Sequence, residues 1–277
     1  MLSTELSDRD FRRFSDLVYK RCGINLHEGK KELVRARLGK RLRETGFKDF
    51  NAYYKFLTQK DNGHELVKML DAISTNLTSF FREEKHFDFL NQVVFPSYVA
   101  GRNGKRLQRL RFWSAGCSSG EEPYSLAISL LEYFGDSPGF DIKILGTDIS
   151  TKVLAQAKGG VYPAARLERM PSSVVRKYFQ RGYGRQEGYF RVKLSVRAMV
   201  EFRRLNLIEP FPFKEAFNLI LCRNVMIYFD KSTQQTLANK FYDALTEEGY
   251  LFIGHSETLT GINHQFKYIR PSVYQKP

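Results

Sequence analysis

The chain has 277 residues, which is enough to bury a sizeable core as one large domain or two smaller ones. Its formal net charge of +14 points to an acidic partner, such as nucleic acid, a membrane surface or an acidic protein. Three widely spaced cysteines suggest no disulfide framework or zinc cluster, and the five histidines form no HxH or HExxH pair, so no metal is expected. The lack of a disulfide framework favours a reduced, cytoplasmic protein. No apolar run approaches the roughly 20 residues of a membrane-spanning helix, and no signal peptide is recognisable.

Residues 1–84 are predicted to form a small all-α domain, because apolar residues recur at helical spacing between cap and stop signals. Ser7 begins a first helix that Gly23 ends. A second helix, from about Lys30 to Glu44, carries seven basic residues beside an apolar stripe. They are Lys30, Lys31, Arg35, Arg37, Lys40, Arg41 and Arg43. Such a helix fits an acidic partner helix or a phosphate backbone, and it equally fits a solvated face of a basic protein.

Residues 85–106 are predicted to form a connecting helix followed by a basic, glycine-containing spacer. Over residues 107–277 strand and helix patterns alternate, which predicts an α/β domain with a mostly parallel sheet and helices on both faces. The expected strands are 109–113, 142–147, 200–205, 217–222, 250–254 and about 268–274, and the expected helices are 121–134, 151–158 and 231–245. Between about residues 172 and 203 the pattern changes to short period-two stretches, which indicates a β-rich insertion.

A strand, a small-residue turn and a helix start follow one another in Trp113-Ser-Ala-Gly-Cys-Ser-Ser-Gly-Glu-Glu-Pro-Tyr124. The turn, which includes Ala115 and Gly116, lets the backbone approach a ligand closely, and the helix start offers free N–H groups. Glu121 and Glu122 stand at that helix start and would repel a pyrophosphate. The motif therefore suits a ligand with an ammonium or sulfonium group, as in S-adenosylmethionine, rather than NAD.

Asp148 follows the next predicted strand at the spacing expected of a ribose-binding acid. Together with the preceding turn, this carboxylate favours a nucleotide-type ligand. The alternative is purely structural. Gly116 and Gly120 would then allow a strand to pack on a helix, and Asp148 would cap the helix that begins near Thr151.

Two further polar segments lie where ligand-binding residues are expected. Thr75–Glu83 joins the helical and α/β domains, and its Arg82 is suited to hold a carboxylate by paired hydrogen bonds. The alternative for this segment is a helix cap followed by a Phe-Phe core anchor. Leu221–Asp230 follows a predicted strand, so its polar residues emerge at the carboxyl edge of the sheet. It contains Cys222-Arg-Asn where methyltransferases of amide or base nitrogens often carry Asn/Asp-Pro-Pro-aromatic, which favours an anionic nucleophile.

Five segments together closely resemble the bacterial chemotaxis receptor methyltransferases, the CheR family, over essentially the whole chain. They are Thr75–Glu83, Trp113–Tyr124, Phe202–Leu207, Cys222–Asp230 and Gly254–Glu257. The resemblance implies a Rossmann-like domain that uses S-adenosyl-L-methionine to esterify glutamate side chains on the cytoplasmic helical domain of methyl-accepting chemotaxis receptors, with S-adenosyl-L-homocysteine as product. It further implies a cytoplasmic monomer that is recruited to membrane receptors and has no nucleic-acid partner. The chemistry is self-consistent, because a glutamate with an ordinary pKa of ~4.3 is already ionised in the cytoplasm and needs no general base.

The resemblance also assigns roles to individual residues. Glu122 is expected near the ammonium group of the cofactor and Asp148 at its ribose. The full set of expected cofactor-binding residues is Asn76, Thr78, Arg82, Ala115, Gly116, Glu122, Asp148, Asn206, Leu207, Arg223 and Asn224. Arg82 and Tyr228 are the expected catalytic residues, which would orient the substrate carboxylate. The expected receptor-binding residues are Lys30, Arg37 and Arg41 on the basic helix, and Gly182, Gly184 and Gly188 in the insertion, which captures a receptor C-terminal peptide in some family members.

Two alternatives stay open. A nucleic-acid methyltransferase would explain the positive charge, and it predicts a basic groove that leads to an aromatic-lined, base-sized pocket. A non-catalytic module that binds receptor helices in response to S-adenosylmethionine would be favoured if Arg82 or Tyr228 lay far from the cofactor.

Overall fold

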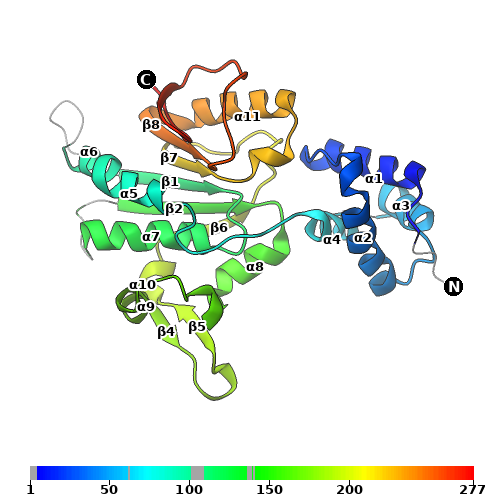
Figure 1. Ribbon diagram of the computed structural model, residues 1–277, viewed down its shortest axis with the longest axis horizontal. Helices are drawn as coiled ribbons and strands as arrows, with labels where there is room; N and C mark the ends of the chain where they lie inside the picture. Colours follow the sequence, from blue (N-terminus) through cyan, green and yellow to red (C-terminus); the bar gives the residue numbers. More distant parts are fainter. Residues whose placement is uncertain (1–4, 62, 101–108, 136–138, 140) are drawn as a thin grey trace.

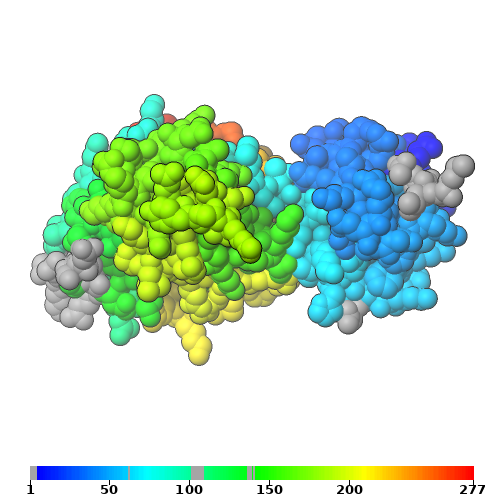
Figure 2. Space-filling view, turned by 90° about the horizontal axis from the view of Figure 1, so that it is seen from below, coloured from blue at the N-terminus to red at the C-terminus, as the bar shows by residue number. Residues whose placement is uncertain are grey.

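The computed structural model describes residues 5–61, 63–100, 109–135, 139 and 141–277. A helical N-terminal domain lies beside a larger α/β domain, and the segment that follows the N-terminal helices runs across to the α/β domain (Figure 1). A view at right angles shows the molecule narrowing between these two bodies (Figure 2). The predicted combination of an all-α domain, a mostly parallel α/β domain and a β-rich insertion is confirmed.

The described part of the N-terminal domain consists of short helices packed around one apolar core. They are α1 (Asp8–Cys22), the 3₁₀ turn η1 (Glu28–Lys30), α2 (Lys31–Thr45), α3 (Phe50–Gln59) and α4 (His64–Ile73). The Ser7 hydroxyl caps α1 and the Asp49 carboxylate caps α3, each by accepting a hydrogen bond from a backbone N–H of the first turn. Gly23 ends α1 with a φ of 74°, a conformation that favours glycine. Phe14 and Tyr53 are completely buried between the helices.

Residues 84–100 form part of the α/β core rather than a simple connection. They fold into α5 (Glu84–Phe89), the π-helical turn η2 (Leu90–Val94) and α6 (Phe95–Ala100). Phe87, Leu90 and Phe95 are buried in the same apolar cluster as the strand residue Phe112. The spacer that we expected at 101–106 lies outside the described residues. The sequence therefore predicted a helix in this segment, but it did not reveal that the helix packs against the main sheet.

A seven-stranded sheet, with the order β6-β2-β1-β7-β8-β10-β9 in the described residues, forms the centre of the α/β domain. The strands are β1 (Arg109–Ala115), β2 (Asp141–Asp148), β6 (Val200–Arg204), β7 (Phe217–Cys222), β8 (Leu245–Ile253), β9 (Lys267–Arg270) and β10 (Val273–Gln275). Pairing is parallel from β6 to β8 and antiparallel between β8, β10 and β9. The chain moves outward from β1 to β2 and later returns to β7 on the other side, so the strand order reverses beside β1. In open α/β sheets, ligands bind at the carboxyl ends of the strands at such a point.

Helices cover both faces of this sheet, and alternate strand residues face them. The helices are α7 (Glu121–Phe134), α8 (Thr151–Gly159) and α11 (Lys231–Ala244), with the 3₁₀ turn η5 (Met226–Tyr228) before α11. Phe112 and Leu219 belong to the apolar cluster on the α7 side, together with α5 and α6. Trp113 and Ile220 belong to the cluster on the α11 side. The sheet therefore supplies a rigid floor for residues placed at its carboxyl edge.

The insertion is a small antiparallel sheet of order β3-β5-β4 below the main sheet (Figure 1). Its elements are β3 (Val161–Pro163), η3 (Ala164–Arg166), α9 (Ser172–Tyr178), β4 (Phe179–Arg181), η4 (Gly184–Gln186), β5 (Tyr189–Val192) and α10 (Leu194–Arg197). It begins at Val161 rather than near residue 172, because β3 already pairs with β5. Three residues ending in a proline are too short to show an alternating pattern.

The end of the chain also differs from the expectation. One strand around 268–274 was predicted, and β9 and β10 form a hairpin instead, with Ser272 at a φ of 65° in the turn. In the described residues, no helix is both long enough and apolar enough to cross a membrane.

Candidate active site

A cavity lies at the carboxyl ends of β1, β2 and β7, and residues of both domains line it. The helical domain contributes the turn after α1, including Ile24, Asn25 and Leu26. The α/β domain contributes the turns that follow the strands. The cavity is therefore completed only where the two domains meet.

The structure brings almost all of the predicted cofactor and catalytic residues together around this cavity. The lining includes Asn76, Thr78, Arg82, Gly116, Glu122, Asp148, Asn206, Leu207, Arg223, Asn224 and Tyr228. Ala115 differs, because its side chain is completely buried in the apolar cluster beneath α11 and does not line the cavity. As the last residue of β1, it supports the turn instead of presenting a side chain to a ligand.

The turn after β1 forms part of the cavity wall. Gly116 has a φ of 85°, and a Cβ atom there would lie 2.4 Å from a methyl group of Val225, so only glycine fits without a shift. The N–H groups of Gly116 and Cys117 both donate to the carbonyl of Thr147, at 2.8 Å each. The turn is thus tied to the end of β2, which places it beside Asp148.

Asp148 presents a buried carboxylate to the cavity. One oxygen accepts a hydrogen bond from the N–H of Ser118, and the other accepts one from the N–H of Ser150, both at 2.9 Å. Burial raises the pKa of Asp148 although these N–H groups oppose the shift. Asp148 does not cap α8, because the Ser150 hydroxyl does so by accepting from the N–H of Val153. Each carboxylate oxygen keeps acceptor capacity for a ligand hydroxyl.

The two glutamates at the start of α7 have different surroundings. Glu121 is completely buried outside the cavity lining, accepts a hydrogen bond from the Ser119 hydroxyl at 2.6 Å, and lies 3.6 Å from Arg166. Glu122 lines the cavity, accepts from the Ser114 hydroxyl at 2.6 Å, and lies 3.5 Å from Arg223. Burial raises the pKa of both carboxyl groups. Only Glu122 is therefore available to a cationic ligand.

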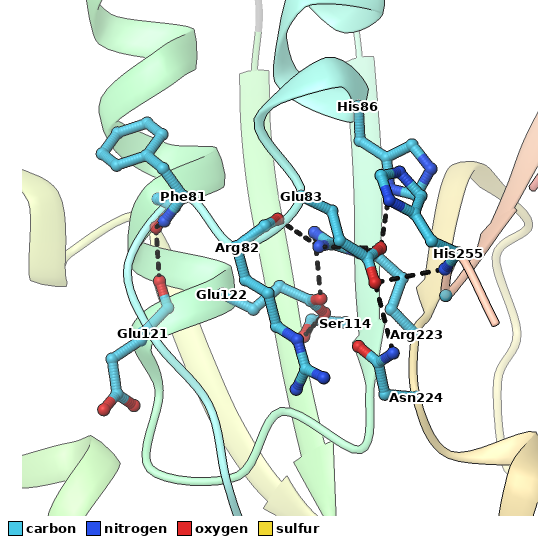
Figure 3. Close-up of polar contacts among 12 residues, drawn as sticks. Phe81, Arg82, Glu83, His86, Ser114, Glu121, Glu122, Arg223, Asn224 and His255 are labelled. Carbon is cyan, nitrogen blue, oxygen red and sulfur yellow. Dashed lines mark hydrogen bonds and ion pairs between the residues drawn. The ribbon is translucent and has the colours of Figure 1, made fainter. Parts of the chain in front are cut away.

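The segment between α4 and α5 forms a second wall and is held along its length. The carbonyl of Asn76 accepts a hydrogen bond from the Ser118 hydroxyl at 2.8 Å, and the carbonyl of Thr78 accepts one from Arg166 at 2.8 Å. The guanidinium of Arg82 donates to the carbonyl of Leu77 at 2.9 Å. Figure 3 shows this guanidinium extending away from Glu83. In the described residues, no carboxylate pairs with Arg82, so its remaining N–H groups suit an incoming one.

Behind Arg82, a buried ion-pair network joins three turns (Figure 3). Arg223 lies 3.2 Å from Glu83 and 3.5 Å from Glu122, and its side chain is 2% exposed. The carboxylate of Glu83 also accepts hydrogen bonds from the side-chain amide of Asn224 at 3.2 Å and from the N–H of His255 at 3.1 Å. The network places one guanidinium between two carboxylates.

The turn after α1 contacts the other side of the cavity. The Asn206 side chain donates to the carbonyl of Arg21 at 2.7 Å, and the N–H of Asn25 donates to the carbonyl of Tyr228 at 2.8 Å. Ile24 also forms an isolated antiparallel bridge with Phe229. The helical domain therefore holds the backbone that carries Tyr228 and Asn206.

The residues expected to face a receptor have varied environments. Lys30 is exposed at the edge of the cavity. Arg37 donates to the carbonyls of Ile73 and Ser74, and Arg41 binds Glu65 with two short contacts of 2.6 and 2.7 Å. Both arginines thus make contacts within the helical domain, which their place on a basic helix did not reveal. Gly182, Gly184 and Gly188 form the turn between β4 and β5, where a Cβ on Gly182 would lie 2.2 Å from the carbonyl oxygen of Gln186.

Sequence reasoning missed two groups of site residues. Glu83, His255 and Glu257 lie in segments that carry the family resemblance, but no function was predicted for them. The turn at Ile24–Leu26 gave no signal, since its part in the cavity depends on how the domains dock. Glu257 accepts from the N–H groups of Asn224 at 2.8 Å and Ile227 at 3.1 Å, so it supports the turn that carries Tyr228.

Comparisons with known proteins agree with this arrangement. A family model described as "CheR methyltransferase, all-alpha domain" matches residues 9–74, and one described as "CheR methyltransferase, SAM binding domain" matches residues 76–274. The boundary between the two matched segments lies about ten residues before the domain boundary that we expected after residue 84.

A chemotaxis protein methyltransferase of Borreliella burgdorferi is 45% identical over 277 residues, which cover 99% of this chain and 96% of that one. Those of Salmonella typhimurium and Escherichia coli are 40% and 39% identical over 270 residues, covering 97% of this chain and 90% and 91% of theirs. The chain therefore belongs to the CheR methyltransferase family, and its cofactor is S-adenosylmethionine.

Proposed function

We propose that this protein transfers the methyl group of S-adenosylmethionine to glutamate side chains on the cytoplasmic helical domain of methyl-accepting chemotaxis receptors. The observation that carries this proposal is the composition of the cavity. Arg82, Glu122 and Tyr228 surround it, and among its described lining residues there is no histidine. Cys22 lines it, but burial raises the pKa of this thiol to about 11, and the thiol donates to the carbonyl of Val18. The lining carboxylates, Glu122 and Asp148, each already accept hydrogen bonds and are assigned to the cofactor, so the cavity suits a nucleophile that is already ionised, as a glutamate carboxylate is.

The cavity residues fit the cofactor. When bound, S-adenosylmethionine supplies an electrophilic methyl group on a positively charged sulfur. Glu122 would hold the ammonium group, because it is the acidic side chain of α7 that faces the cavity. Asp148 would accept hydrogen bonds from the ribose hydroxyls with its unused lone pairs. Asn206 and Leu207 would border the adenine on the side closed by the turn after α1.

Arg82 and Tyr228 would act on the substrate. Arg82 would bind one oxygen of the incoming glutamate by a charge-assisted hydrogen bond and so orient the other oxygen. Tyr228 also lines the cavity, and its phenol would limit where the carboxylate can settle. Alignment of the reacting atoms, rather than proton transfer, would supply most of the rate enhancement. A very tight ion pair would reduce the reactivity of the carboxylate, so orientation is the expected role of Arg82.

Receptor docking would use the outward side of α2 and the insertion. Arg35, Lys40 and Arg43 are exposed on α2, and Lys30 is exposed immediately before it. Arg37 and Arg41 would contribute indirectly, because their internal contacts fix the position of α2. A receptor C-terminal peptide would bind at the insertion, where the turn of Gly182, Gly184 and Gly188 shapes the end of the small sheet. Such docking would recruit a monomeric enzyme to receptors at the membrane.

The test is incubation of the protein with methyl-labelled S-adenosylmethionine and a receptor cytoplasmic fragment, followed by mild base. Carboxyl methyl esters release labelled methanol under these conditions, and release that requires the receptor fragment is the expected result. Label that resists base would point to a methylated amine or nucleobase instead. Tight binding of both partners without any transfer would point to a non-catalytic module.

A further inference from the structure

The backbone on both sides of Arg82 has an uncommon conformation. Phe81 has a φ of 51° and Glu83 a φ of 59°, and both lie in the left-handed region that non-glycine residues rarely adopt. Such conformations persist where the surroundings hold them, and they concentrate at functional sites. The direction of the Arg82 side chain therefore depends on contacts made by its two neighbours.

Each part of this turn has a specific partner. The N–H of Phe81 donates to the hydroxyl of Ser125 at 2.9 Å. The carbonyl of Arg82 accepts a hydrogen bond from Arg223, as Figure 3 shows. The carboxylate of Glu83 contacts Arg223 and accepts hydrogen bonds from Asn224 and His255.

The Glu83 carboxylate is the point where three turns meet. Arg223 and Asn224 reach it from the turn after β7, and the N–H of His255 reaches it from the turn after β8. Its side chain is 11% exposed, and among the described residues it does not belong to the cavity lining. Burial opposes ionisation of Glu83, but Arg223 and the hydrogen bonds from His255 and Asn224 outweigh burial, so the pKa of this carboxyl lies below its ordinary value. Glu83 therefore carries a negative charge at neutral pH without being exposed to a ligand.

From this geometry we propose that Glu83 is a positioning residue for methyl transfer. Its carboxylate fixes the turn from which Arg82 reaches the substrate, and it divides the charge of Arg223 between itself and Glu122. Without this charge, Arg223 would pair with Glu122 alone and would compete with the ammonium group of the cofactor. The role of Arg82 toward a substrate carboxylate rests on the proposed function, whereas the holding of the turn does not.

A metal site is the other interpretation of this cluster. One possible ligand atom from each of Glu83, His86 and His255 lies within 4.8 Å of the others, and neither ring nitrogen of buried His86 has a hydrogen-bond partner in the described residues. However, the Glu83 oxygen that lies 3.4 Å from His86 is the same oxygen that Arg223 contacts at 3.2 Å. A divalent cation there would stand against a buried guanidinium. Pairing with Arg223 is therefore the better explanation of the Glu83 charge.

The test compares E83Q and E83A with E84Q, a matched control at the adjacent exposed glutamate. Initial rates are measured at saturating S-adenosylmethionine and receptor fragment, together with calorimetric cofactor affinity and thermal unfolding. E83Q preserves the shape of the side chain and removes its charge, so it should fold and lose about 10- to 100-fold in kcat, with E83A at least as slow. E84Q should match the parent protein. Dialysis against EDTA should leave the parent activity unchanged.

Hydrogen exchange gives a readout that does not depend on methyl transfer. A peptide spanning residues 77–83 should be protected in the parent protein and in E84Q, and it should exchange faster in E83Q. If kcat in E83Q and E83A stays within about twofold of the parent, or if the parent peptide is already unprotected, the positioning role is wrong. EDTA-sensitive activity would overturn the ion-pair interpretation. If the parent protein transfers no methyl group at all, the proposed function fails, and the exchange comparison still decides whether Glu83 holds the turn.

Discussion

Replacing Arg41 with alanine should destabilise the helical domain, although Arg41 lies on a helix that looks solvated in sequence. Arg41 donates to both oxygens of Glu65, and the hydroxyl of Tyr53 donates to the same carboxylate at 2.8 Å. The Arg41 and Glu65 side chains are only 16% and 11% exposed. Removing one partner of a buried ion pair typically costs about 3–5 kcal/mol, because the other charge stays buried without a counter-ion. The partial exposure of both side chains favours the lower end, about 3 kcal/mol.

Urea denaturation measures this cost. With a dependence of about 2 kcal/mol per molar urea, the midpoint for the helical domain should fall by about 1.5 M. Far-ultraviolet circular dichroism follows helices in both domains, whereas the fluorescence of Trp113, the single tryptophan, follows the α/β core. The dichroism midpoint should therefore move more than the fluorescence midpoint. Arg43→Ala, at an exposed position on the same helix, serves as the control and should shift neither midpoint appreciably. Equal midpoints for Arg41→Ala and the parent protein would refute the assignment of a stabilising role to this pair.

Three further substitutions address the cavity and its surroundings. Asp148→Asn should weaken S-adenosylmethionine binding by about tenfold, because charge-assisted hydrogen bonds to the ribose are lost; an unchanged calorimetric Kd would contradict the ribose assignment. Arg82→Lys should lower kcat by about 100-fold without lowering the melting temperature, since a single ammonium group cannot reproduce the geometry of a guanidinium, and normal turnover would remove its substrate-orienting role. Burial lowers the pKa of His86 to about 3 in the folded protein, whereas a histidine in the unfolded chain has a pKa of about 6.5. The unfolded chain therefore binds a proton that the folded protein does not, and the free energy of unfolding should fall as the pH drops from about 6.5 to about 3. His86→Leu should make this decrease smaller, exposed His64→Gln should not, and identical pH slopes for all three proteins would show that His86 is not responsible.

The regular elements of the α/β domain were predictable because their local patterns and their tertiary environments agree. The strand before Gly116 contains Leu110, Phe112, Trp113 and Ala115, which are all buried, as expected of a central strand covered on both faces. The helix from Glu121 to Phe134 appears with the expected bounds. In contrast, Val161–Pro163 forms a strand only because β5 lies beside it, and three residues carry too little pattern to reveal that partner.

The site shows the same division between local and long-range information. Asp148 is the last residue of β2 and Asn224 lies two residues after β7, so their arrival at one edge of the sheet follows from topology. The contribution of Ile24 could not be predicted, because it depends on the docking of two domains separated by long stretches of sequence. The internal role of Arg41 was hidden for a similar reason. Its partner Glu65 lies on another helix, and charge pattern alone does not distinguish a paired arginine from a solvated one.

The bridge between Ile24 and Phe229 has a consequence for how the protein can be divided. A fragment that lacks the helical domain would retain every described strand and most of the polar cavity residues, yet the cavity would be open to water beside Asn206 and Leu207, where we propose that the adenine binds. Leu207 and Phe229, which are nearly buried in the intact chain, would then lose their cover from the turn after α1. The two family-model segments are therefore separable in sequence, but the cavity is enclosed only when both are present.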